Sequence, residues 1–129
     1  MNGKNITTEN ECCGISAAMY LAASKIKIEE VENDNGQFSQ LKNTPNPFNE
    51  ATVISFMLTH FSDVKIAIYD LTGNKMFDLM NEKMEAGKQT VLLYKYSNIG
   101  HLAAGNYLYE LTVENENGIF KQCKILHVL

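Results

Sequence analysis

Three residue types that could carry out nucleophilic catalysis stand close together in the chain: His60, Ser62 and Asp63. In a catalytic triad the nucleophile, its base and the orienting carboxylate usually come from separate elements and converge in space. These three residues fall instead in one predicted connection between two strands. Loop composition explains the trio better than catalysis does, and we predict that the chain is not an enzyme.

The sequence supports a metal site no better than it supports a catalytic triad. The other two histidines, His101 and His127, are isolated, so no multi-histidine spacing exists. The run Asn33–Gly36 resembles a calcium loop, but placing its glycine at the sixth position puts Val31 and Lys42 where carboxylates are required. The run is better explained as a solvated linker. We predict no metal site and no cofactor.

The cysteines are few, and they do not form a recognisable framework. Cys12 and Cys13 are adjacent and could bridge each other only through a strained ring, whereas either one could pair with Cys123. The odd number argues against a disulfide-stapled domain. We expect Cys123 to be a buried thiol in a strand.

Composition excludes several classes of function. The chain has 129 residues and a net charge of −4, and all eleven of its cationic residues are lysines. Duplex-binding proteins usually use a basic face and arginine forks, so nucleic acid is not an expected partner. No apolar run approaches the roughly 18 residues that span a bilayer. The hydrophobic share of 45% is enough for the core of one ordinary domain.

The first part of the chain, residues 1–37, has the pattern of a helix and a linker. A capping-box spacing joins Thr8 to Glu11, and a helix is predicted from about Glu9 to about Glu30. Its apolar stripe consists of Ile15, Met19, Ala22 and Ile26. The stripe is narrow, so we predict that this segment associates with another copy. The alternation in Lys25–Ile28 is equally typical of a strand, which leaves the second half of the segment open.

The same segment does not have the form of a signal peptide. It carries Glu9 and Glu11 where a basic region is expected, and its apolar stretch is interrupted at Ser16. If the protein is exported, we expect its export signal to lie upstream of Met1. The polar run at residues 33–40 is linker-like, and it is the expected site of any proteolytic processing.

From residue 38 to residue 129 the sequence has the period-2 alternation of β-strands. Short alternating runs are separated by turn residues, and no run has the helical spacing of a βαβ crossover. These features predict an all-β domain, an antiparallel immunoglobulin-like β-sandwich of about seven strands. We expect the terminal hairpin, residues 105–128, to be central, with Tyr107, Leu111 and Val113 facing the core together.

Several segments of this β part resemble, in the same order, the C-terminal sorting domain of the type IX (Por) secretion system, of type A. The segment with Pro-Asn-Pro-Phe resembles the opening of that domain, and later segments resemble its strand-turn motif, its glycine turn, its Gly-x-Tyr motif and its basic-apolar last strand. These segments are Leu41–Thr52, Ile68–Asn74, Ala86–Lys88, Leu102–Tyr109 and Lys124–Leu126.

The resemblance singles out a set of motif and recognition residues: Pro45, Asn46, Pro47, Phe48, Gly73, Gly87, Gly105, Tyr107 and Lys124. Each also has a purely structural explanation. The two prolines exclude a central strand, Phe48 would plug the turn, the glycines supply positive φ, and Tyr107 would be a core aromatic. The chain departs from the family pattern at Tyr94–His101, a longer connection than usual, and it lacks a tryptophan.

The resemblance implies a non-catalytic function. Such a domain follows a cargo protein that enters the periplasm, and an outer-membrane translocon recognises the folded domain. Associated machinery processes the protein, which is then secreted or held at the cell surface. The alternative is an immunoglobulin-like binding or adhesion module for a glycan or a protein, which exposed aromatic side chains on one sheet face would favour.

Overall fold

A computed structural model describes residues 36–129, and it confirms an all-β domain of seven strands. The predicted N-terminal helix and its self-association concern residues outside this range. The strands are β1 (Phe38–Thr44), β2 (Ala51–Leu58), β3 (Ser62–Tyr69), β4 (Lys75–Met84), β5 (Gly87–Tyr94), β6 (Gly105–Asn115) and β7 (Gly118–Val128).

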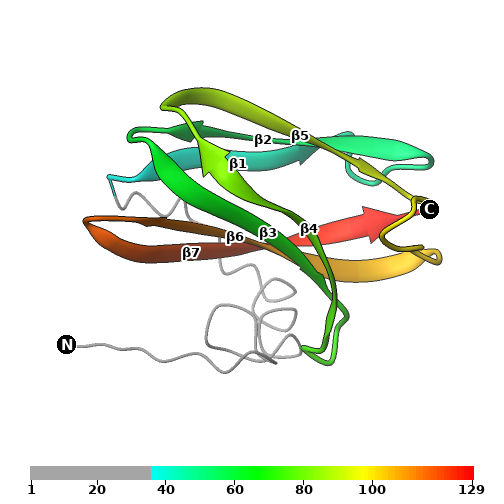
Figure 1. Cartoon of the computed structure of the whole chain (residues 1–129). Helices are drawn as coiled ribbons and strands as arrows, with labels where there is room; N and C mark the ends of the chain where they lie inside the picture. The colour runs from blue at the N-terminus through cyan, green and yellow to red at the C-terminus, as the bar shows by residue number, and fades with distance from the viewer. Residues whose placement is uncertain (1–35) are drawn as a thin grey trace, which may run out of the picture.

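The strands form two antiparallel sheets that pack face to face as a sandwich (Figure 1). One sheet has three strands in the order β1-β2-β5, and the other has four in the order β4-β3-β6-β7. The predicted antiparallel β-sandwich is therefore confirmed. Among residues 36–129, no helix is long and apolar enough to cross a bilayer.

The period-2 alternation of the sequence produces the core directly. In β2 the alternate residues Thr52, Ile54, Phe56 and Leu58 are all buried, while Val53 between them faces solvent. Successive side chains of a strand point to opposite faces, so one apolar face of each sheet meets the other. All seven strands contribute to the core between the sheets: Leu93 of β5 belongs to the buried cluster, and the partly buried Phe77 of β4 packs against it.

The terminal hairpin is only partly as expected. Tyr107, Leu111 and Val113 of β6 do face the core together, and β6 lies between β3 and β7. β7, however, is the outer strand of its sheet, because it pairs along its length with β6 alone. Its other edge is therefore available to a segment outside the sheets.

A second, smaller buried cluster lies on the outer face of the four-stranded sheet, and it includes Tyr69, Leu108 and Cys123. The hydroxyl of Tyr69 donates a hydrogen bond to a carboxylate oxygen of Glu110 at 3.1 Å. Cys123 is buried as expected, but it is disulfide-bonded, so the expectation of a thiol is wrong. The other two cysteines lie outside the described residues.

Candidate functional site at the junction of the first and last motifs

The Pro-Asn-Pro-Phe segment forms the loop between β1 and β2. Its first three residues, Pro45, Asn46 and Pro47, are exposed, whereas the Phe48 side chain is 1% exposed and belongs to the core. Prolines have no backbone N–H, so Asn46 and Phe48 are the only backbone donors in these four residues. The predicted role of Phe48, a plug that fixes this loop to the sandwich, is confirmed.

The loop runs alongside the edge of β7 that the sheet leaves open. Phe48 and Val128 form a parallel β-bridge. The backbone N–H of Phe48 donates to the carbonyl of His127 at 3.1 Å, and the N–H of Leu129 donates to the carbonyl of Phe48 at 2.9 Å. An open strand edge is a template for pairing, and here the protein covers the last part of that edge with its own first motif.

The side chain of Asn46 continues this pairing where the prolines cannot. Its Oδ1 accepts a hydrogen bond from the backbone N–H of His127 at 3.0 Å, and its Nδ2 donates to the carbonyl of Ile125 at 3.2 Å. The amide presents one acceptor and one donor, as a backbone residue of an added strand would. Asn46 therefore acts as one more residue of the ladder. We call residues 45–48 and 125–129 together the junction.

Buried polar side chains hold the base of the loop. The carbonyl of Pro45 accepts a hydrogen bond from Thr52 Oγ1 at 2.7 Å, and Asn43 Nδ2 donates to the same Thr52 oxygen at 3.2 Å. Both Asn43 and Thr52 are buried. Buried polar groups that lose a partner are costly, so these bonds fix the loop relative to β1 and β2.

Two further residues, Lys95 and Asn106, complete the junction, and the sequence interpretation assigned neither of them to it. Lys95 Nζ donates a hydrogen bond to the backbone oxygen of Leu129 at 2.6 Å. The His127 ring forms a short hydrogen bond between its Nδ1 and Oδ1 of Asn106. Neither contact has a signal in the sequence, because Lys95 is 34 positions from Leu129 and His127 is 21 positions from Asn106.

The Gly-x-Tyr motif and Lys124 lie on the strands next to the junction. In the β6–β7 register Gly105 is opposite Val128, Tyr107 is opposite Leu126, and Lys124 is opposite the buried Tyr109. The Tyr107 hydroxyl donates to the carbonyl of Ala103 at 2.7 Å, which anchors the start of β6. Lys124 is half-buried on the outer strand β7, where it lies on the same face as the core residues Leu126 and Val128.

The other two glycines occupy separate turns. Gly87 begins β5, with φ of 121°, and no contact joins it to the junction among the described residues. Gly73 has φ of 93° in the β3–β4 turn, where Asp70 Oδ1 accepts hydrogen bonds from Thr72 and from the N–H of Asn74. Desolvation of Asp70 opposes ionisation, but these bonds outweigh it and hold the pKa of Asp70 below its ordinary value.

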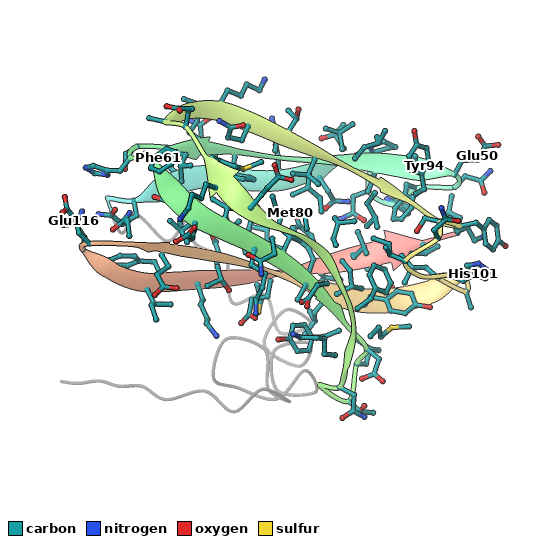
Figure 2. All side chains as sticks on the ribbon, viewed as in Figure 1. Glu50, Phe61, Met80, Tyr94, His101 and Glu116 are labelled. Carbon is teal, nitrogen blue, oxygen red and sulfur yellow. The ribbon has the colours of Figure 1, made fainter. Side chains whose placement is uncertain are left out.

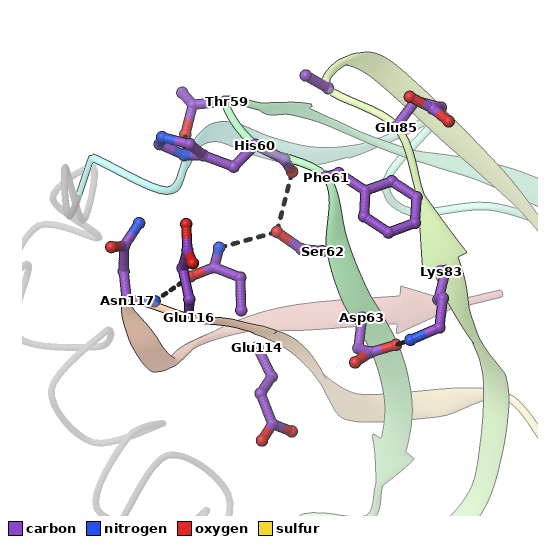
Figure 3. Close-up of a pocket in the computed structure, with 12 residues that line it drawn as sticks. Thr59, His60, Phe61, Ser62, Asp63, Lys83, Glu85, Glu114, Glu116 and Asn117 are labelled. Carbon is purple, nitrogen blue, oxygen red and sulfur yellow. Dashed lines mark hydrogen bonds and ion pairs between the residues drawn. The ribbon is translucent and has the colours of Figure 1, made fainter.

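His60, Ser62 and Asp63 do not form a catalytic triad. They line a cavity of about 590 Å³ at the opposite end of β2 from the Pro-Asn-Pro-Phe loop (Figure 3). Ser62 Oγ donates to the backbone carbonyl of His60 and not to its ring, and Asp63 forms an ion pair with Lys83 at 2.8 Å. Among residues 36–129, no three potential ligands form a metal-binding group.

Comparisons with known proteins agree with the fold and with the family resemblance of the sequence. The family profile described as "Secretion system C-terminal sorting domain" matches residues 44–125. A crystal structure of dimeric latent PorU from Porphyromonas gingivalis is similar in fold, with a TM-score of 0.59 and 20% identity over 69% of this chain. The chain spans 9% of that protein's length.

A β-glucuronidase from Parabacteroides merdae matches more weakly, with a TM-score of 0.44 and 13% identity over 71% of this chain and 13% of that one. A search among curated proteins found no match. The match at residues 44–125 covers more than half of the chain and includes the Pro-Asn-Pro-Phe loop, the turns and most of β7. The chain therefore belongs to the family of secretion system C-terminal sorting domains.

Proposed function

We propose that the junction is the part of this sorting domain that the type IX secretion machinery recognises. The domain is a non-catalytic module that marks its protein for export to the cell surface or the medium. The observation that carries the proposal is the set of four hydrogen bonds by which residues 46–48 hold residues 125–129. They unite the first and last family motifs into one surface that only the folded domain presents.

The residues around the junction suit recognition by a protein partner. Pro45, Asn46 and Pro47 are exposed beside the outer strand, and Lys124 presents a positive charge on that strand. The whole chain is acidic, with a net charge of −4, so the positive charge of this lysine differs from the average charge of the chain and would favour an acidic partner surface. Gly73 and Gly87, in our proposal, contribute by shaping turns and not by contacting the translocon.

We further propose the arrangement of the whole protein. A cargo domain lies upstream of the sorting domain, and residues 1–37 connect the two. The cargo enters the periplasm before the outer-membrane translocon recognises the sandwich. We infer an immunoglobulin-like connectivity within the domain, because the β2–β3 and β4–β5 connections both pass from one sheet to the other.

The test measures export of a reporter protein in a bacterium that has a type IX system. The reporter carries a periplasmic signal at its N-terminus and the full 129-residue chain at its C-terminus. We expect Lys124→Ala to keep the fold but to accumulate in the periplasm. Lys42→Ala is the matched control, since Lys42 is an exposed lysine on β1. A Lys124→Ala reporter that reaches the surface at the wild-type rate would refute the recognition role of Lys124.

A further inference from the structure

A hollow of about 500 Å³ lies at the start of β2 and the end of β5, and the sorting function does not account for it. It is lined by Asn49, Glu50, Tyr94, Lys95 and Tyr96. Figure 2 shows Tyr94 and Glu50 at the same end of the sandwich, far from the exposed Phe61. Its volume is within the range of roughly 300–1,000 Å³ that is typical of small-molecule sites.

Two aromatic rings face solvent in this hollow. Tyr94 is 51% exposed and Tyr96 is 66% exposed, which is a large exposed area for two aromatic side chains that line one hollow. Tyr94 is the last residue of β5, and the chain bends at Lys95 before it reaches Tyr96. Both tyrosines line the hollow, so each can offer an apolar ring face to a sugar bound there.

Polar groups line the hollow beside the two rings, and no contact within residues 36–129 uses them. Within residues 36–129, the Asn49 amide, the Glu50 carboxylate and the two tyrosine hydroxyls make no hydrogen bond or ion pair. Together they offer several donors and acceptors beside an apolar surface. A ligand that fits must have both a C–H face for the rings and hydroxyl groups for the rim.

The site is held rigidly by the backbone around it. The N–H of Lys95 donates to the carbonyl of Glu50 at 2.8 Å, and the carbonyl of Lys95 accepts from the N–H of Leu102, a fully buried residue, at 2.9 Å. The Tyr96 ring meets the His101 ring edge-on at 5.5 Å, and Lys95 Nζ lies 5.6 Å from its centroid. Preorganised groups lose little entropy on binding.

We propose that this hollow is a saccharide-binding site that stacks a neutral pyranose on Tyr94 and Tyr96, with Asn49 and Glu50 hydrogen-bonded to its hydroxyls. A saccharide has the alternation of apolar C–H patches and hydroxyls that this lining complements, whereas a hydrophobic peptide would leave the carboxylate and the amide without partners. An isolated β-bridge and an edge-on ring contact join Tyr96 to His101, and both support the Tyr96 ring.

The experiment is ligand-observed saturation-transfer NMR on the full chain. The probes are the methyl glycosides of glucose, galactose, mannose, N-acetylglucosamine, N-acetylgalactosamine, fucose and rhamnose. We expect at least one glycoside to receive saturation. We expect Tyr96→Ala to weaken its binding about ten-fold, and Tyr96→Phe, which keeps the ring, to weaken it only about three-fold. Glu50→Gln tests the polar rim and should also weaken binding.

Phe61→Ala is the matched control, because Phe61 is an exposed aromatic, at 55%, at the other end of the sandwich. Thermal melts of every variant verify the fold. The proposal is wrong if no glycoside receives saturation, or if Tyr94→Ala and Tyr96→Ala bind the glycoside as tightly as Phe61→Ala does. A peptide that binds at these tyrosines while every glycoside fails would reassign the hollow to a protein partner. None of these outcomes depends on export through the translocon.

Discussion

The side-chain oxygen of Asn46 accepts a hydrogen bond from the backbone N–H of His127 at 3.0 Å, although the two residues are 81 positions apart in the chain. This contact makes an exposed loop residue part of the pairing pattern of the last strand. It also explains why an asparagine lies between two prolines: its side chain supplies the donor and the acceptor that the neighbouring backbone lacks.

Replacing Asn46 should therefore weaken the whole domain. Asn46→Ala removes both hydrogen bonds to β7, and we expect a loss of about 1–3 kcal/mol in the free energy of unfolding. Urea denaturation monitored by circular dichroism measures the change. Asn49→Ala, an exposed asparagine in the same connection, is the control and should stay within about 0.5 kcal/mol of the wild type. Equal stabilities of the two variants would show that the Asn46 bonds contribute nothing.

Removing residues 119–129 should abolish folding. The truncation takes Leu126 and Val128 out of the core and leaves the backbone of β6 without its partner strand. Each buried backbone group that loses its partner costs about 1–3 kcal/mol, against a total stability of about 5–15 kcal/mol for a small domain. The far-ultraviolet circular dichroism spectrum should be that of an unfolded chain. A cooperative melt of the truncated protein would contradict the role given to β7.

Gly100 should not tolerate a side chain. A Cβ atom at this position would lie 2.4 Å from two carbon atoms of the Phe77 ring, which packs against the core. Gly100→Ala should therefore displace Phe77 at a cost of about 1–3 kcal/mol. Asn98→Ala, a change at an exposed position of the same loop, is the control. Matching thermal midpoints for the two variants would mean that Phe77 moves without cost.

The Asp70 turn should make the free energy of unfolding fall as the pH is lowered into the acid range. Because the pKa of Asp70 is lowered in the folded state, its contribution is fully present above the ordinary pKa of about 3.9 and is lost as the pH falls through the lower, folded value. We expect the wild type to lose more stability than Asp70→Asn between about pH 6 and about pH 2. Urea titrations of both proteins at each pH measure the difference. Parallel losses in the two proteins would rule out this contribution.

The sequence predicts the strands well because alternation and turn residues can be recognised within a few neighbouring positions. Alternation along β2 determines that Ile54, Phe56 and Leu58 face inward, and turn residues such as Gly73 mark where strands end. The order of strands within a sheet is not local, which is why β7 was expected to be central and is instead an edge strand.

The sequence predicted individual residues of the junction but not the contacts that join them. Phe48 was correctly assigned to the core from its place after two prolines. Nothing in the sequence links Asn46 to His127 or Lys95 to Leu129, because these contacts join backbone groups whose partners depend on tertiary structure. Cys123 illustrates the same limit, since the odd number of cysteines pointed to a thiol and the residue is disulfide-bonded.

The bridge between Phe48 and Val128 has a consequence for the timing of export. Contacts between residues so distant in sequence form only after most of the intervening chain is available. The ribosome synthesises residues 125–129 after everything that precedes them, so the junction cannot assemble before these residues have been made. Under the proposal that the secretion machinery recognises the junction, a translation product that stops before residue 125 would lack the surface that is recognised.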